Sequence, residues 1–351
     1  MAKAKGPVTA AVIGLGRSGW DIHVSQMRKR DDFKIVAVAD PLADRVEQAK
    51  KELNCEGYPD IKTLLKNCDA ELIVVATRSA DHMADSILSL KAGRHVLCEK
   101  PVAMNASEVK KVLAAAKQAK RLYFPHQNYR FNSISRHLHE LLAGKSPIGP
   151  VFDLKLNATG FKRRNDWQCL RKNGGGMLFN QCTHMLDMTM SAAGSPVVET
   201  YCHVKQTTDS GDCEDHVKIV LQTKRGIQID ISYSTSMNIE LPAYIICGEY
   251  GTAWSDGKTT TMRYFDPKKF PKLKVVDGAA ANRKYGNEEQ LVWTETTLPS
   301  EGKSIGSLYD NVQAVLRKGA KMVVTGEQVL AMHEVIDECR RQNPKFKQVG
   351  K

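Results

Sequence analysis

The chain has 351 residues, of which 42% are hydrophobic, and it carries a formal net charge of +12. This length favours two domains, and no apolar run approaches the roughly 20 residues that a membrane-spanning helix requires. The basic residues are dispersed, apart from FKRRNDW at residues 161–167, so the charge favours an anionic cofactor or substrate over nucleic acid. Nine cysteines without a CxxC pair are typical of a reducing compartment, and we therefore expect a cytoplasmic protein with no nucleic-acid or membrane partner.

Apolar strands alternate with helices through about residue 125. Strands are predicted within residues 7–13, 33–41, 70–77, 94–101 and 121–125, and helices begin after the first glycine turn and lie within residues 42–53, 81–93 and 105–120. Asn105 or Ser107 is the expected cap of the last of these helices. Because the strands are almost entirely apolar, we predict a parallel sheet covered on both faces, in a domain spanning residues 1–125.

The remaining sequence has the alternating polarity of a largely antiparallel sheet with one open face. Strands are predicted within residues 151–160, 198–208, 215–223, 226–236 and 243–251, and helices within residues 133–144, 181–194, 304–319 and 326–342. Residues 264–290 are the most loop-like part. The histidines of HLHEL, His137 and His139, are two residues apart and are interpreted as surface residues. We therefore predict an α/β domain followed by an α+β domain at residues 126–351, whose C-terminal helices pack back on the first.

A dinucleotide-binding pattern lies near the N-terminus. Gly14, Gly16 and Gly19 form G-x-G-x-x-G between a strand and a helix, and Asp40 ends the next strand. The helix N-terminus would receive the pyrophosphate, and the Asp40 carboxylate would accept the ribose hydroxyls. The carboxylate would repel a 2′-phosphate, so we predict NAD rather than NADP. Arg17 and Arg45 lie near enough in sequence to soften that preference.

Four segments, taken together, resemble one family of oxidoreductases. They occur in order over nearly the whole chain: VIGLGRSG, VATRSADHMADSILSLKAGRHVLCEKPVAMN, GGGMLFNQCTHMLD and YDNVQAVLRKG. They are similar to the glucose–fructose oxidoreductase / inositol dehydrogenase / MocA family. The resemblance implies an N-terminal Rossmann domain, a C-terminal domain with a large open sheet, and redox chemistry on a secondary alcohol or ketone of a sugar, sugar derivative or cyclitol.

The resemblance also implies roles for individual residues. Lys100 corresponds to the lysine of the family's E-K-P motif, and His184 to its histidine. Asn180 replaces the aspartate that many family dehydrogenases have four residues before this histidine, and Arg78 replaces a proline. The expected cofactor contacts are Gly14, Gly16, Arg17, Ser18, Gly19, Asp40, Arg45, Thr77, His82, Glu99 and Lys100.

Alcohol oxidation needs a base for the hydroxyl proton, and His184 is the best candidate because its pKa is ordinarily close to neutrality. If Asn180 caps the helix that follows it, the positive helix end keeps His184 neutral. Lys100 lies at the carboxyl end of a strand, where it can stabilise a developing alkoxide. Asn180 is expected to orient substrate hydroxyls, to cap the helix, or both. Two further roles stay open: Glu99 pairs with the cofactor or ends the strand, and Asp187 orients substrate or is structural.

The expected substrate contacts are Lys100, Asn128, Arg130, Arg164, Asp166, Trp167, Asn180, His184 and Asp187, with Trp167 able to stack on a pyranose ring. DCEDH at residues 212–216 has the composition of a metal site but precedes an alternating strand, so no metal is predicted. An open sheet face favours a homodimer or homotetramer.

We predict an NAD-dependent oxidoreductase that acts on a ring secondary alcohol of a sugar, a glycoside (at its C3 hydroxyl, for example) or an inositol. The alternatives are NAD-dependent glycoside cleavage through transient oxidation and elimination, and a non-catalytic nucleotide-bound sensor.

Overall fold

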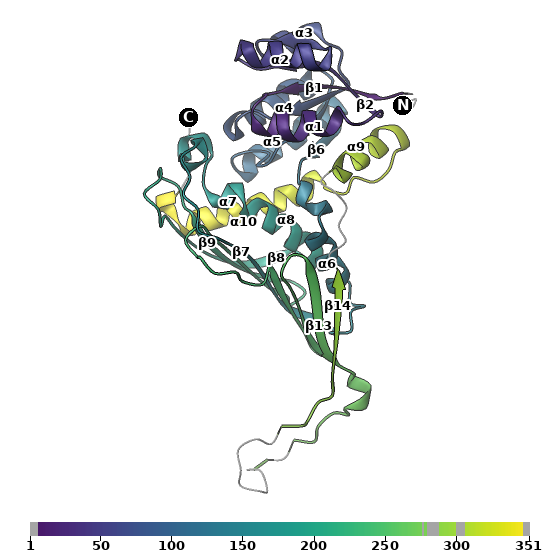
Figure 1. Cartoon of the computed structure of the whole chain (residues 1–351), viewed down its shortest axis with the longest axis vertical. Coiled ribbons are helices and arrows are strands. Elements are labelled where there is room, and N and C mark those ends of the chain that lie inside the picture. The colour runs from purple at the N-terminus through teal and green to yellow at the C-terminus, as the bar shows by residue number, and fades with distance from the viewer. Residues whose placement is uncertain (1–5, 276, 279–287, 300–305, 347–351) are drawn as a thin grey trace.

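The computed structural model describes residues 6–275, 277–278, 288–299 and 306–346, and it divides into two sheets with helices between and around them (Figure 1). Within this part of the chain, no helix combines the length and the apolar composition needed to cross a bilayer.

The first sheet is parallel and has the strand order β3-β2-β1-β4-β5-β6. Its strands are β1 (Val8–Ile13), β2 (Phe33–Ala39), β3 (Glu56–Tyr58), β4 (Leu72–Val75), β5 (His95–Cys98) and β6 (Tyr123–Pro125). All four residues of β4 are buried, because helices cover both faces of the sheet. This confirms the predicted Rossmann-type sheet. The strand order reverses between β1 and β4, and ligands of such sheets bind at the strands' carboxyl ends beside this point.

The helices of this half include one departure from the expected α-helix after the glycine turn. Residues Ser18–Val24 form a π-helix, η1, continued by the short α1 (Ser25–Met27). The others are α2 (Ala43–Leu53), α3 (Ile61–Asn67), η2 (Ser79–Asp81), α4 (His82–Lys91) and α5 (Ala106–Ala119). Asn105 caps α5 by accepting a bond from the Glu108 amide. The sequence analysis missed β3 and α3, since a three-residue strand with partly exposed side chains has no readable period.

The second sheet has eight strands in the order β14-β13-β12-β11-β7-β10-β9-β8, and every pairing is antiparallel except β7 with β10. Its strands are β7 (Val151–Thr159), β8 (Val197–Lys205), β9 (His216–Thr223), β10 (Gln228–Ser234), β11 (Tyr244–Gly248), β12 (Gly251–Ser255), β13 (Thr259–Phe265) and β14 (Trp293–Pro299). The mostly antiparallel sheet is confirmed, with β12, β13 and β14 added to the predicted strands. Part of the predicted loop, residues 276 and 279–287, lies outside the described residues.

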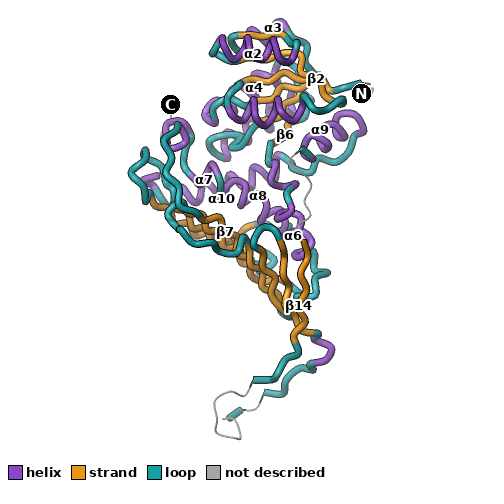
Figure 2. Tube along the Cα trace, viewed as in Figure 1, coloured by secondary structure: helices purple, strands orange, loops and turns teal. Residues whose placement is uncertain are grey.

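Helices line one face of this second sheet (Figure 2). The longer helices on this face are α6 (Ser133–Leu142), α8 (Cys182–Ala193) and α10 (Gly326–Gln342). The second half of the chain also contains α9 (Ser307–Lys318), which lies against the first sheet, and the short elements η3 (Asn128–Phe131), η4 (Trp167–Cys169), η5 (Arg171–Asn173), α7 (Met177–Asn180), η6 (Pro267–Lys269) and η7 (Pro344–Phe346). Along β9, Val217, Ile219 and Leu221 are buried under the helices, while the alternate residues are partly exposed on the other face.

The C-terminal helices return to the first half of the chain. Helix α10 lies between the two sheets in Figure 1 and contacts both α5 and β8. Helix α9 buries Leu308, Tyr309 and Val312 in the core formed by β1 and β2. The assignment of residues 1–125 and 126–351 to separate domains stays a prediction.

The surface interpretation of His137 is wrong. His137 is buried under the sheet, and its Nδ1 lies 2.8 Å from the hydroxyl of Thr260 on β13, whereas His139 is exposed. The spacing of the two histidines does separate their directions, and a threonine hydroxyl from a distant strand satisfies the buried ring of His137.

Candidate active site

The glycine loop after β1 is closed by contacts that tolerate no side chain. Gly14 has a positive φ of 85°, and a Cβ there would lie 2.5 Å from the Ala76 carbonyl oxygen. A Cβ on Gly19 would lie 1.8 Å from the Gly14 carbonyl oxygen, so η1 packs directly on the loop. At Gly16, by contrast, the nearest atom is 4.0 Å away, on Arg45. The backbone is thus open at the position where a pyrophosphate would approach.

Asp40 is held beside this loop. Its Oδ2 accepts a bond of 2.7 Å from the Leu15 amide, and its Oδ1 accepts one of 2.9 Å from the Leu42 amide. Arg45 Nη1 lies 3.4 Å from Oδ2, and the Arg45 side chain is 45% exposed. The loop and the fixed carboxylate together fit a dinucleotide at the topological switch point, and the exposed guanidinium stands next to the carboxylate that would select the ribose.

Lys100 lies just beyond β5, before a cis bond to Pro101, at the edge of a cavity of about 50 Å³. Its Nζ donates to the main-chain oxygen of Asn180 at 2.7 Å and to the Asn180 side-chain oxygen at 3.2 Å. An ammonium has three hydrogens, so one is left for a substrate oxygen. The cavity brings together the predicted site residues Ser18, Thr77, His82, Glu99, Lys100, Trp167 and Asn180.

The surroundings of Lys100 lower the pKa of its ammonium group. The pKa of Lys100 is lowered to about 8, mainly by burial; the charge of Glu99 opposes this shift, and the charges of Arg17 and Arg164 add to it. A lysine with this pKa is able to exchange a proton in the neutral to mildly alkaline range.

His82 and Thr77 hold the walls of the cavity. The two ring nitrogens of His82 lie 2.7 Å from the Pro101 oxygen and 3.0 Å from the Thr77 oxygen, and the Thr77 hydroxyl donates to Asp85. Because His82 bridges the segments after β4 and β5, it fixes the backbone that carries Lys100.

Glu99 belongs to a buried cluster that the sequence analysis missed. Its Oε1 lies 3.2 Å from His23 Nε2 and 3.1 Å from His126 Nδ1, and the Tyr309 hydroxyl lies 2.7 Å from His23 Nδ1. Its Oε2 accepts from the Lys100 amide at 2.9 Å. Burial raises the pKa of Glu99, but His126 and His23 outweigh it and hold this pKa well below the usual range. Burial, reinforced by His126, lowers the pKa of His23 to about 4.

The Glu99 cluster, which consists of His23, Glu99, His126 and Tyr309, thus fixes the backbone of Lys100 through the bond from the Lys100 amide to Glu99. The atoms of His23, Glu99 and His126 are close enough together to suit a metal ion, but Tyr309 and Glu99 already bond both nitrogens of His23. No pattern in the sequence joins these residues, which come from η1, the end of β5, the end of β6 and α9.

His184 lies near the start of α8, with its ring stacked on Tyr129 at a centroid distance of 4.0 Å and an angle of 12°. Burial, and secondly the charge of Lys100, lower the pKa of His184 well below its ordinary value. The expectation of a pKa near neutrality is therefore wrong, since a buried ring beside an ammonium disfavours a second positive charge. In the described chain its Nδ1 is buried without a hydrogen-bond partner.

Asn180 does not cap α8, contrary to one of the two expectations for it. It is the last residue of α7, and Gln181 occupies the N-cap position of α8 without a side-chain capping bond. The Asn180 side-chain oxygen instead accepts from Lys100 Nζ at 3.2 Å and from Gln168 Nε2 at 3.4 Å, and Asn180 Nδ2 donates to Gln168 Oε1 at 3.3 Å. The sequence analysis did not identify Gln168.

Of the predicted residues of FKRRNDW, Trp167 lines this cavity, while Arg164 and Asp166 contact Gln168, which also lines it. Arg164 Nη2 pairs with Asp166 Oδ2 at 2.7 Å, and Asp166 Oδ1 caps the short η4 through the Gln168 amide. Trp167 is 40% exposed and lines the cavity.

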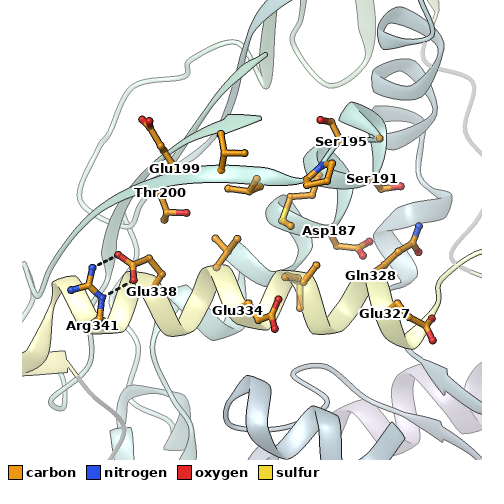
Figure 3. Close-up of a pocket in the computed structure, with 18 of the residues that line it drawn as sticks. Asp187, Ser191, Ser195, Glu199, Thr200, Glu327, Gln328, Glu334, Glu338 and Arg341 are labelled. Atoms are coloured by element: carbon orange, nitrogen blue, oxygen red, sulfur yellow. Dashed lines mark hydrogen bonds and ion pairs between the residues drawn. The ribbon is translucent and has the colours of Figure 1, made fainter. Parts of the chain in front are cut away.

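Arg130 and Asp187 form a buried ion pair away from the Lys100 cavity. Arg130 Nε donates to Asp187 Oδ2 at 2.9 Å, and Arg130 Nη2 lies 2.5 Å from Oδ1. Both residues line a groove of about 1000 Å³ between α8, β8 and α10, which Figure 3 shows with Asp187 at its wall. They were expected to bind substrate, but both line this groove and neither lines the Lys100 cavity. Asn128 is buried, and in the described chain its side-chain oxygen has no hydrogen-bond partner.

The acids of DCEDH accept bonds from the backbone amides of three separate segments, one of which is α7. Glu214 Oε1 accepts from the Leu178 amide at 2.9 Å, and a Cβ on Gly176 would lie 2.3 Å from the same oxygen. Asp212 bonds the Arg171 amide, and Asp215 bonds Thr207 and Thr208. Burial raises the pKa of Glu214 to about 7.

Comparison with known proteins agrees with this architecture. Residues 8–127 match the model of an oxidoreductase family with an NAD-binding Rossmann fold, and residues 136–254 match the C-terminal domain model of the same family, GFO/IDH/MocA. A myo-inositol 2-dehydrogenase of Thermotoga maritima is 28% identical over 61% of this chain and 65% of its own length. A D-glucoside 3-dehydrogenase of Escherichia coli is 26% identical over 57% and 58%.

The chain thus aligns with somewhat less than two thirds of these curated relatives. The crystal structure of an NAD-binding protein from Listeria innocua superimposes with a TM-score of 0.81 at 22% identity, covering 99% of this chain and 97% of that one. The parallel sheet with its glycine loop, the second open sheet and the two matched domains lead to one conclusion: the chain belongs to the GFO/IDH/MocA family of NAD-binding oxidoreductases.

Proposed function

We propose that this protein is an NAD-dependent dehydrogenase that oxidises, or in reverse forms, a ring secondary alcohol of a sugar, glycoside or inositol. The observation that carries the proposal is the pair of bonds from Lys100 Nζ to Asn180 at the carboxyl edge of the parallel sheet, with the buried His184 near enough for the Lys100 charge to lower its pKa. The names of the relatives that act on inositol and glucosides support the substrate class.

When bound, NAD supplies the hydride acceptor. The chain's own residues then handle the proton and the oxygen. Neutral His184 takes the hydroxyl proton as the C–H hydride leaves the same carbon, and the third hydrogen of the Lys100 ammonium bonds the oxygen on which negative charge develops. Asn180 holds the other two hydrogens of Lys100, so the free one has a defined direction.

A panel of sugars, glycosides and inositols, assayed for NADH formation, tests this proposal. Turnover by the unmodified protein, with loss of turnover in Lys100→Met, supports it. Release of a glycosidic leaving group without net NADH would favour glycoside cleavage instead. Binding of NAD without turnover of any member would favour a nucleotide-bound sensor.

We further propose that the protein is cytoplasmic and forms a homodimer or homotetramer through the open face of the second sheet. The face opposite the helices includes Trp254, which lies between the buried residues Ala253 and Ser255 and points away from the core they face. Paired sheets would cover this surface.

A further inference from the structure

Three positively charged side chains gather around the carboxamides of Gln168 and Asn180, which line the Lys100 cavity. Arg17 comes from the glycine loop, Lys100 from the end of β5 and Arg164 from the segment after β7. Lys100 Nζ lies 3.2 Å from Asn180 Oδ1, and the Asn180 carboxamide in turn contacts Gln168. The charges of Arg17 and Arg164 both act on Lys100, which shows that the three lie within one electrostatic neighbourhood.

One oxygen receives an unusual set of donors. Gln168 Oε1 accepts from Arg17 Nη2 at 3.3 Å, from Asn180 Nδ2 at 3.3 Å, and from Arg164 Nη2. An amide oxygen is neutral and has two lone pairs, whereas guanidinium groups bind carboxylate oxygens more strongly and with a matching planar geometry. The carboxamide of Gln168 therefore occupies a position suited to a carboxylate.

Few negative charges balance this group. Asp166 pairs with Arg164, and Glu99 is engaged by His23, His126 and the Lys100 amide. The Asn180 side chain is neutral, whereas an aspartate at this position would repel an anion bound beside the three positive side chains. The Gln168 backbone is held separately, by the Asp166 side chain and the Gly176 amide, so its side chain is able to rotate aside without unfolding the loop.

From this convergence we infer that the substrate carries a carboxylate, which displaces the Gln168 carboxamide and binds Arg164 and Asn180. The inference rests on the proposed function and narrows its substrate to an acidic sugar, such as a uronic acid or its glycoside. The Asn180 carboxamide, which bonds both Lys100 and Gln168, would connect this anion position to the lysine that holds the reacting oxygen. Arg17 directly follows Gly16 in the loop that is expected to contact the cofactor, so Arg164 is the residue to test.

Methyl β-D-glucuronide and methyl β-D-glucoside form a matched pair, because they differ only in a carboxylate against a hydroxymethyl group. We expect kcat/KM for the glucuronide to exceed that for the glucoside by about 10–100-fold, as is typical of charge-assisted bonds. Arg164→Gln should abolish the preference, and Asn180→Asp should reduce it. Arg163→Gln is the control, since Arg163 is 70% exposed and pairs with Asp209.

Equal or better use of the glucoside, or equal losses on both substrates in Arg164→Gln, would overturn the inference and leave the dehydrogenase proposal intact. If neither compound is oxidised, calorimetry of both compounds with the NADH complex decides. Binding of the glucuronide alone, lost in Arg164→Gln and kept in Arg163→Gln, would uphold the anion site while the proposed activity fails. Absence of glucuronide binding would reject the site, and an equal response to inorganic phosphate would reject carboxylate selectivity.

Discussion

The ammonium of Lys100 donates a 2.7 Å hydrogen bond to the main-chain oxygen of Asn180, which lies 80 residues further along the chain. This contact joins the end of a strand of the parallel sheet to the short helix α7 that precedes His184. It sets both the direction of the lysine and the environment of the histidine, and most of the predictions below depend on it.

The first prediction concerns the base. Replacing His184 with Asn removes the titrating ring but keeps a polar side chain, so turnover should fall by about 10²–10⁴-fold. NAD affinity should change little, because the glycine loop and Asp40 are untouched. Single-turnover hydride transfer and NAD titration measure the two effects. Near-full turnover in this variant, with hydride transfer limiting, would instead make Lys100 the leading candidate for the base.

The pH dependence follows from two shifted groups. His184 must be neutral, and burial holds its pKa well below the ordinary value, so kcat/KM for oxidation should rise only at acidic pH. Lys100 must be an ammonium, and its pKa is about 8, so kcat/KM should fall as pH rises through that value. A profile that rises through pH 8 would show that neutral Lys100 is the active form.

The Asn180→Asp variant tests the same pKa of Lys100 in a second way. The new carboxylate would stand where Asn180 Oδ1 lies, 3.2 Å from Lys100 Nζ. An adjacent negative charge favours the ammonium, so the pKa of Lys100 should rise and the alkaline limb of the profile should move to higher pH. An unshifted alkaline limb would mean that another group produces it.

Cofactor choice should depend on Asp40. We expect NAD to bind more tightly than NADP. Asp40→Ser should reduce the ratio of the two affinities by roughly tenfold or more, which corresponds to about 1.4 kcal/mol. The serine removes the repelling charge while the exposed Arg45 stays available to a 2′-phosphate. Titration calorimetry with both nucleotides measures this, and a preference for NADP in the unmodified protein would contradict it.

The ion pair of Arg130 and Asp187 should matter for stability. Both side chains are buried, and loss of one partner leaves an uncompensated charge, so Arg130→Met should lower the free energy of unfolding by about 3–5 kcal/mol. Adding Asp187→Leu should restore part of the loss. Urea unfolding of the single and double variants tests the pair. A raised KM with unchanged stability would return Arg130 to the substrate site.

Oligomer formation should depend on the open sheet face. Trp254→Glu places a charge on that face and should shift light scattering toward the monomer mass. Lys258→Glu, in the exposed turn between β12 and β13, is the matched control and should leave the mass unchanged. A monomer at micromolar concentration in the unmodified protein would contradict sheet pairing.

The sequence by itself determined those features that depend on neighbouring residues or on a repeating period. Apolar runs and the glycine pattern predicted the parallel sheet and its nucleotide edge, and alternation predicted the core strands of the second sheet. Motifs of a few residues located Lys100, Asn180, His184 and Asp40. Short elements such as β3 escaped because three residues do not define a period.

Only the tertiary structure decided which distant side chains meet. It brought His23, Glu99, His126 and Tyr309 together, turned Asn180 toward Lys100 rather than toward a helix cap, and placed Gln168 between two guanidinium groups. It also paired Arg130 with Asp187 in a groove separate from the Lys100 cavity. Hydrogen-bond partners and burial depend on how separate elements pack, and burial beside an ammonium lowered the pKa of His184 in a way that a local sequence pattern does not encode.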